Sequence, residues 1–185
     1  MTERMGNVRT SVGALLLGLW MTAAFLHPAA ADGLLRSYID SFTREDGGYV
    51  LYRNARYGTV ISYPGDLFSP LPPPGNGDGR TFETADGAAR FYVFAQFNAL
   101  GQGQKEMLEQ DKAADWRDDV TYERSGAGWY VISGHSGDDI FYRKVIVEPS
   151  DLVRVFEITY PSAMRAQMDA AVTRMSRSFG AAASP

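Results

Sequence analysis

The sequence predicts an α+β domain in which a largely antiparallel β-sheet is covered by helices on both faces. Strand-like runs outnumber helical segments and follow one another through short turns rich in glycine and aspartate, which favours antiparallel hairpins. Several runs are apolar on both faces: Phe91 and Val93 alternate with Tyr92 and Phe94. A sheet with one solvated face would alternate apolar and polar residues, so we expect both faces of this sheet to be covered.

The chain begins with a basic start, an apolar run and a small-residue motif. Arg4 and Arg9 precede the apolar run 12–26, and Pro28 precedes Ala29-Ala30-Ala31. This pattern predicts a secretory signal peptide over residues 1–31, cleaved after Ala31. The apolar run is shorter than the roughly 20 residues of a membrane-spanning helix, although retention as an anchor stays open. We therefore expect a periplasmic or secreted protein with no membrane span after cleavage. The sequence does not decide between these two locations.

Length, charge and cysteine content narrow the class of protein. The chain has 185 residues, with 18 basic and 22 acidic side chains and no cysteine. This length favours one domain, and the excess of acidic residues argues against nucleic-acid binding. Without cysteine the protein has no disulfides, no lipid anchor attached through cysteine, no thiolate metal ligands and no thiol catalysis.

The first part of the mature chain is predicted to contain a lead-in segment and four strands. Segment 32–48 is expected to form a lead-in or short helix, because apolar residues recur at helical spacing in it, with a flexible tether as the alternative. The domain itself is expected over residues 49–180, and residues 181–185 form a C-terminal tail. Residues 64–79 are rich in proline and glycine and predict a long loop. The strands are predicted at residues 49–54, 57–63, 80–84 and 89–97.

A helix, four more strands and a final helix are predicted in the second half. Residues 104–116 are rich in helix formers. The final helix begins near Ser162, carries an apolar stripe that includes Met168 and Val172, and should end at Gly180. The four strands between the helices are predicted at residues 120–124, 129–133, 140–147 and 152–160.

Five runs of the sequence resemble a domain of uncharacterised exported bacterial proteins: Tyr57–Pro64, Asn76–Arg80, Trp129–Gly134, Ile140–Lys144 and Phe156–Pro161. The resemblance covers roughly residues 49–180. The order of elements is similar to the PsbP-like (PsbP/DcrB-type) α/β/α sandwich. Characterised members of that fold look like docking or accessory modules rather than enzymes, and the resemblance implies the same kind of role here. Fold analogy alone does not establish a function.

The sequence offers no recognisable catalytic motif. His135 is the one histidine after the signal segment, and Ser133 and Ser136 flank it in a glycine-rich stretch. A serine hydrolase would place its serine in a Gly-x-Ser-x-Gly turn, which is missing, so we expect His135 to be a solvated turn residue. One imidazole without thiolates is a poor metal site. We therefore expect no catalytic residue, no metal and no cofactor, while enzyme activity stays open.

The long loop supplies the first group of candidate binding residues, Asn76, Asp78 and Arg80. Their spacing departs from a calcium-binding loop, because Arg80 occupies a position where an oxygen ligand is required. They are expected either to bond to the local backbone of a turn or to form a polar recognition patch.

Charged residues inside apolar strands supply the second group. Arg143, Lys144, Arg154 and Glu157 interrupt such strands. Cross-strand ion pairs would explain them. A partly buried Arg143 that captures an anionic ligand is the alternative, because a buried charge needs a partner. Tyr142 is added as a candidate because the predicted strands are rich in tyrosine, which favours protein or ligand contact where it is exposed.

Three functions follow from these observations. The first is an exported non-enzymatic binding or accessory domain that docks to an envelope component, with an envelope protein as the partner. The alternative is a carrier of a small anionic ligand, bound in a pocket between sheet and helix. A hydrolase comes third.

Overall fold

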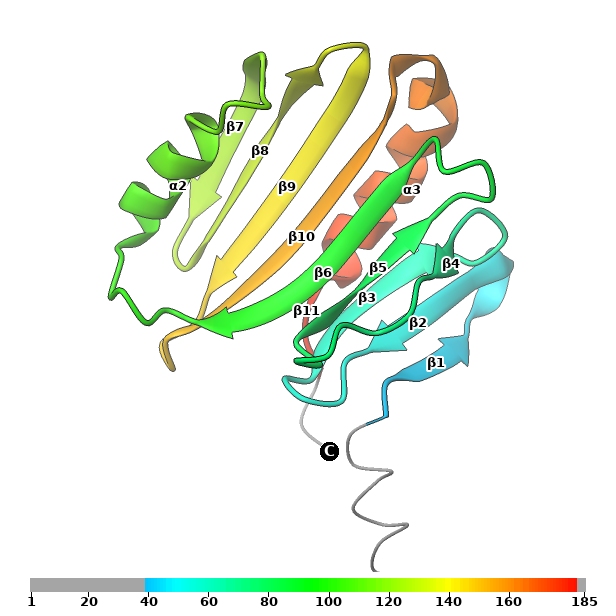
Figure 1. The fold of residues 1–185 in the computed structure, drawn as a ribbon, viewed down its shortest axis with the longest axis horizontal. Helices are drawn as coiled ribbons and strands as arrows, with labels where there is room; N and C mark the ends of the chain where they lie inside the picture. Colours follow the sequence, from blue (N-terminus) through cyan, green and yellow to red (C-terminus); the bar gives the residue numbers. More distant parts are fainter. Residues whose placement is uncertain (1–38, 183–185) are drawn as a thin grey trace, which may run out of the picture.

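Residues 39–182 are described by the structure, which is a computed structural model (Figure 1). The predicted signal peptide and most of the predicted lead-in helix lie outside these residues. No helix in the range 39–182 is long and apolar enough to cross a membrane.

The larger of two antiparallel sheets has the order β4-β5-β6-β10-β9-β8-β7 (Figure 1). Its strands pair with their neighbours through antiparallel registers, as the glycine- and aspartate-containing turns predicted. In sheet order, its members are β4 (Ser69–Pro70), β5 (Gly79–Glu83), β6 (Arg90–Phe97), β10 (Leu152–Pro161), β9 (Asp139–Val147), β8 (Trp129–Ser136) and β7 (Asp119–Gly126).

A second, four-stranded sheet has the order β1-β2-β3-β11. β1 (Ser41–Arg44) lies inside segment 32–48 and pairs with β2 (Tyr49–Arg53), and a 3-10 turn, η1 (Asp46–Gly48), joins them. β3 (Thr59–Pro64) pairs with β2 and with β11 (Gly180–Ala181). The chain ends predicted as lead-in and tail therefore both contribute strands to this sheet, through pairings between distant segments.

The two α-helices differ in how closely they match the predicted ranges. α2 (Gln104–Lys112) ends earlier than predicted, whereas α3 (Arg165–Ser178) follows a short 3-10 helix, η2 (Ser162–Met164), and matches the predicted final helix. The buried residues of α3 are Met168, Ala171, Val172 and Met175, which lie on the predicted apolar stripe.

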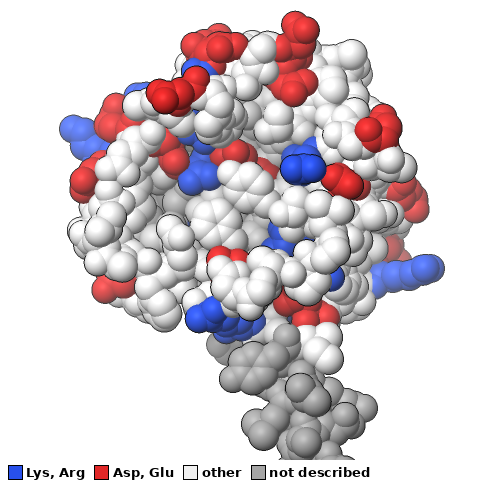
Figure 2. All heavy atoms as spheres, in the orientation of Figure 1, with Lys and Arg blue, Asp and Glu red and all other residues white. Residues whose placement is uncertain are grey.

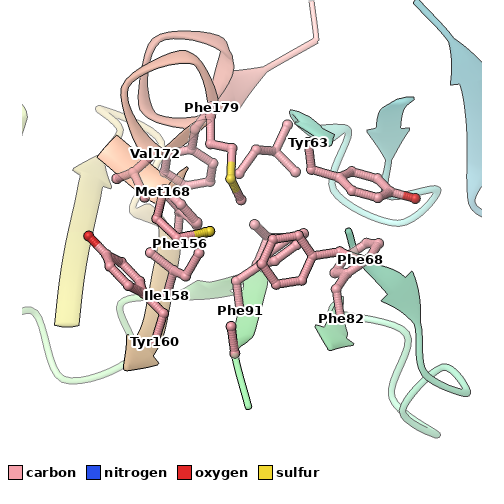
Figure 3. Packing of buried hydrophobic residues seen from close by; sticks show 14 of the residues in the cluster. Tyr63, Phe68, Phe82, Phe91, Phe156, Ile158, Tyr160, Met168, Val172 and Phe179 are labelled. Carbon is pink, nitrogen blue, oxygen red and sulfur yellow. The ribbon is translucent and has the colours of Figure 1, made fainter. Parts of the chain in front are cut away.

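The main core lies between one face of the larger sheet, the smaller sheet and α3, and we call this face of the larger sheet the α3 face. Phe91 and Phe156 project from it: Phe91 contacts the Tyr63 ring of the smaller sheet, and Phe156 contacts the Phe179 ring at the end of α3 (Figure 3). Phe82 and Phe91 stack with ring centroids 4.3 Å apart. The opposite face, the α2 face, carries a separate apolar cluster that includes Tyr130, Phe141 and Leu108 of α2.

The largely antiparallel sheet is confirmed, but its cover differs from the prediction. On the α3 face much of the cover is a second sheet, because the first two predicted strands pair with each other and with β11 instead of joining the larger sheet. On the α2 face, Leu108 is the buried helical residue of the apolar cluster. On the α3 face, β7, β8 and β9 are left partly open, and the site described below lies over them.

Candidate functional site

The predicted site residues fall in three separate places. In the long loop, the Asn76 side chain donates a hydrogen bond to Asp78 Oδ2 at 2.7 Å, and the Asn76 carbonyl accepts one from Arg56. Arg80 turns toward the smaller sheet, where its Nη1 lies 3.7 Å from the Asp40 carboxylate. Asn76 and Asp78 thus stay together, while Arg80 helps to anchor the loop near the start of the described chain.

Arg143 lies on the α2 face in a cluster of paired charges that consists of Asp111, Arg117, Arg143 and Glu157. Arg143 Nε donates to Asp111 Oδ2 at 2.6 Å, and its Nη1 donates to Glu157 Oε2 at 3.0 Å. Glu157 is the register partner of Arg143 on β10, so the predicted cross-strand pairing is correct for these two residues. Although burial opposes its charge, the two carboxylates raise the pKa of Arg143 above its ordinary value.

Arg117 is the fourth member of this charge cluster. Arg117 donates to Glu157 Oε2 at 2.9 Å, and the side chains of both residues are almost fully buried. The Trp116 ring centroid lies 4.2 Å from the Arg117 guanidinium, on which Nε and Nη1 have no hydrogen-bond partner within residues 39–182. Because the cluster has as many carboxylates as guanidinium groups, it leaves little positive charge for a ligand in the adjacent cleft of about 380 Å³ beside α2.

A larger hollow, of about 620 Å³, lies on the α3 face over β7, β8 and β9. We call it the α3 groove, because Ser176 of α3 forms one wall. Its volume is within the range of small-molecule sites. The residues that line it are Tyr122, Arg124, Ala127, Gly128, Trp129, Val131, Tyr142, Lys144, Ile146, Val147, Glu148, Pro149 and Ser176.

The strand register arranges the floor of the groove in three cross-strand rows, because directly opposite residues of antiparallel strands share a face. The aromatic row is Tyr122–Ser133–Tyr142. The cationic row is Arg124–Val131–Lys144, and the apolar row is Gly126–Trp129–Ile146. Two positive side chains therefore lie two strands apart, with apolar or aromatic side chains on either side.

Gly126 determines where the Trp129 indole lies. A Cβ atom at residue 126 would be 2.5 Å from Trp129 Nε1, so the indole occupies the space that a side chain would fill. The Arg124 guanidinium lies 6.0 Å from the centroid of the same ring. Because Gly126 has no side chain, the Trp129 ring provides a flat apolar surface beside the Arg124 cation.

Lys144 is fixed to the wall of the groove. Its Nζ donates to the Ser176 carbonyl oxygen at 2.7 Å, and the Ser176 hydroxyl bonds to the Tyr142 hydroxyl at 2.6 Å. Within residues 39–182 no carboxylate lies within ion-pair distance of Lys144. Glu148, which lines the same groove, pairs instead with Arg154 at 2.7 Å. Burial alone lowers the pKa of the Lys144 ammonium.

His135 lies outside both hollows. Its Nδ1 is 3.0 Å from Asp119 Oδ1, and the imidazole is exposed. Ser133 Oγ donates to the Phe141 carbonyl, and Ser136 Oγ donates to the Trp116 carbonyl, so neither hydroxyl bonds to the imidazole. Residues 133–136 belong to β8 rather than to the predicted turn. No group of three or more histidine, aspartate or glutamate side chains suited to a metal ion occurs in residues 39–182.

Comparison with known proteins identifies the fold. No family model and no curated protein matches the chain. The solution structure of cyanobacterial PsbP (CyanoP) from Synechocystis sp. PCC 6803 is similar to this structure, with a TM-score of 0.53. The two chains are 11% identical, and the alignment covers 76% of this chain and 98% of that chain. The predicted PsbP-like fold is therefore confirmed, and at this identity the similarity concerns the fold alone.

The sequence prediction identified only one residue of the α3 groove, Tyr142, as a site residue. Lys144 was noted only as a charged residue inside an apolar strand, and Arg124 and Trp129 were not singled out. Strand parity would have separated Arg143 from Lys144, since neighbouring side chains in a strand face opposite sides of the sheet. It would not have shown which of the two lies near carboxylates.

Proposed function

We propose that this protein is a non-enzymatic binding domain that carries a small organic anion in the α3 groove. The observation that supports this proposal is Lys144, a half-buried ammonium group that bonds to a backbone carbonyl and has no carboxylate partner within residues 39–182. The Ser176 carbonyl uses one N–H group of this partly desolvated ammonium, so an anionic ligand would be stabilised by the N–H groups that are left.

The charges around the groove agree with this proposal. Arg124 adds a second positive group and forms no ion pair within residues 39–182, its contact there being the Trp129 ring. By contrast, Arg143 is already compensated by Asp111 and Glu157. This revises the choice of residue for a small-ligand carrier: the anion contact moves from Arg143 to Lys144, on the opposite face of the same strand.

The N-terminal sequence suggests where such a domain acts. Residues 1–31 have the pattern of a secretory signal, so we place the protein in the periplasm or outside the cell. On the face shown in Figure 2, acidic and basic side chains are interspersed. A binding role outside the cytoplasm agrees with the acidic composition and with the PsbP-like fold.

The test is a calorimetric panel of small organic anions that includes aromatic carboxylates, dicarboxylates, alkyl carboxylates and sugar phosphates. The proposal requires at least one anion whose binding is lost in Lys144→Met and retained in Lys112→Met, a matched change on α2 outside the groove. It is wrong if no anion binds the wild-type protein, or if both variants bind as the wild type does.

Docking to an envelope component is the second candidate function. It is favoured by two exposed apolar side chains, Phe97 at the end of β6 (62% exposed) and Leu100 in the turn that follows (83% exposed). Exposed aromatic and aliphatic residues of this kind are typical of protein contacts. Asn76 and Asp78 would provide a separate polar contact in the long loop. Cross-linking in envelope preparations that is lost in Phe97→Ser with Leu100→Ser, but not in Lys144→Met, would support docking over the carrier function.

A further inference from the structure

We infer that the ligand of the α3 groove is an alkyl monocarboxylate, a single apolar chain that ends in one carboxylate. This inference rests on the proposed function and specifies its ligand class. It follows from the order of the three rows on the groove floor and from the lack of a free cation at the far end of the groove.

The cationic row fixes the position of the carboxylate. Lys144 Nζ uses one of its three N–H groups on the Ser176 carbonyl, which leaves two for an incoming oxygen. Arg124 faces the same row from β7, with Val131 between the two cations. A carboxylate above Val131 would be within reach of both side chains.

The apolar row fixes the direction of the tail. Trp129 and Ile146 lie two residues further along their strands, about 6.6 Å from the cationic row by strand geometry. Beyond them the groove continues over Ala127, Val147 and Pro149. In the other direction the Tyr142 hydroxyl bonds to Ser176 and presents a polar group. An alkyl chain would therefore bury more apolar surface when it runs toward Trp129.

The far end of the groove offers no free cation to a second negative charge on the tail. Glu148 lines this end, and Arg154 Nε compensates its carboxylate at 2.7 Å. A ligand with carboxylates at both ends would place its second charge beside this ion pair and among apolar side chains, without a cation of its own. This arrangement favours a monocarboxylate over a dicarboxylate of the same length.

The experiment compares ligands that differ in one property each, by calorimetry on the purified protein below the concentration at which they form micelles. Octanoate should bind, whereas acetate, octanol, octanedioate and octyltrimethylammonium should bind at least tenfold more weakly. Each methylene between butanoate and octanoate should strengthen binding about fourfold. Lys144→Met should weaken octanoate binding about tenfold or more and reduce the preference for octanoate over octanol, with Arg124 left as the remaining cation.

Lys112→Met is the matched control and should leave octanoate binding unchanged. Arg124→Gln is the second groove variant and should also weaken binding, so the inference stays testable if Lys144→Met fails to fold. Equal binding of octanoate and octanedioate, or of octanoate and octanol, would overturn the inference. If another class of anion binds through Lys144 and alkyl carboxylates do not, this inference fails while the proposed carrier function stands.

Discussion

Arg143 and Lys144 are neighbours in β9, yet they lie on opposite faces of the larger sheet and differ in how their charges are compensated. Arg143 bonds to the carboxylates of Asp111 and Glu157, whereas Lys144 bonds to the Ser176 carbonyl. Strand geometry separates the two side chains, and the elements that cover each face determine their partners. The charge cluster is therefore expected to contribute to stability, and the α3 groove to binding.

Removing the central carboxylate of the charge cluster should destabilise the protein strongly. Glu157→Gln would leave the buried Arg117 and the partly buried Arg143 with one charge partner fewer each. We expect the free energy of unfolding to fall by about 3–5 kcal/mol, because breaking one side of a buried ion pair leaves an uncompensated charge. Urea denaturation provides the measurement. Glu83→Gln, in the more exposed pair with Arg90, is the control and should cost less than about 1 kcal/mol.

Adding a methyl group at residue 126 should displace the Trp129 indole. In Gly126→Ala the new Cβ would lie 2.5 Å from Trp129 Nε1, so the indole must shift from its place on the groove floor. We expect a red shift of the tryptophan emission and a loss of about 1–3 kcal/mol of stability. Gly75→Ala is the control, since a Cβ there meets no atom within 4 Å. An unchanged emission spectrum in Gly126→Ala would contradict this account of the indole position.

The lowered pKa of Lys144 should make stability depend on pH in the alkaline range. Between the lowered folded-state pKa and the ordinary value of about 10.5, the unfolded chain binds more protons than the folded chain. The free energy of unfolding contributed by this residue therefore rises with pH across that window. Lys144→Met removes the contribution, so wild-type stability should rise relative to the variant as pH approaches 10.5.

The measurement is the difference in unfolding free energy between wild type and Lys144→Met at several pH values. Taking the difference cancels titrating groups that the two proteins share, such as Tyr142 in the groove, whose pKa burial raises. A difference that is constant from neutral pH to about pH 10.5 would show that the folded and unfolded states bind this proton equally.

The raised pKa of Tyr130 should make the protein less stable as the pH rises above about 10. Burial, reinforced by the Asp111 carboxylate 2.5 Å from its hydroxyl, raises the pKa of Tyr130 above the ordinary value. Above about pH 10 the unfolded chain loses this proton while the folded chain keeps it, so stability falls as pH rises. Tyr130→Phe should show a shallower fall, measured as urea midpoints across this range. Equal slopes for the two proteins would rule out the contribution of Tyr130.

The local features of the fold could be predicted because contiguous residues determine them. The apolar stripe of α3 and the glycine- and aspartate-containing turns between strands depend on residues a few positions apart. The second sheet could not be predicted in this way. Its pairing of Gly180 with Val60 joins distant segments, and β1 carries no period-two pattern because all four of its residues are exposed.

The candidate site was predicted only in outline. Charged residues inside apolar strands indicated a partly buried cation, and Tyr142 lies on the face of the sheet that carries the α3 groove. Arg143 was named from the sequence, where its charge alone does not distinguish it from Lys144. The distinction depends on Asp111, which is 32 residues away from Arg143 and comes close only when α2 folds against the α2 face.

By itself, the sequence determined a largely antiparallel sheet with two apolar faces, an amphipathic helix as the last helix of the chain, and a core without disulfides. These properties follow from hydrophobic periodicity, backbone preferences and composition. The tertiary structure alone decided that the early strands form a second sheet, that Arg143 is compensated and that Lys144 faces an open groove. Such pairings depend on which distant segments meet when the core is buried, and residues near one another in the chain do not encode them.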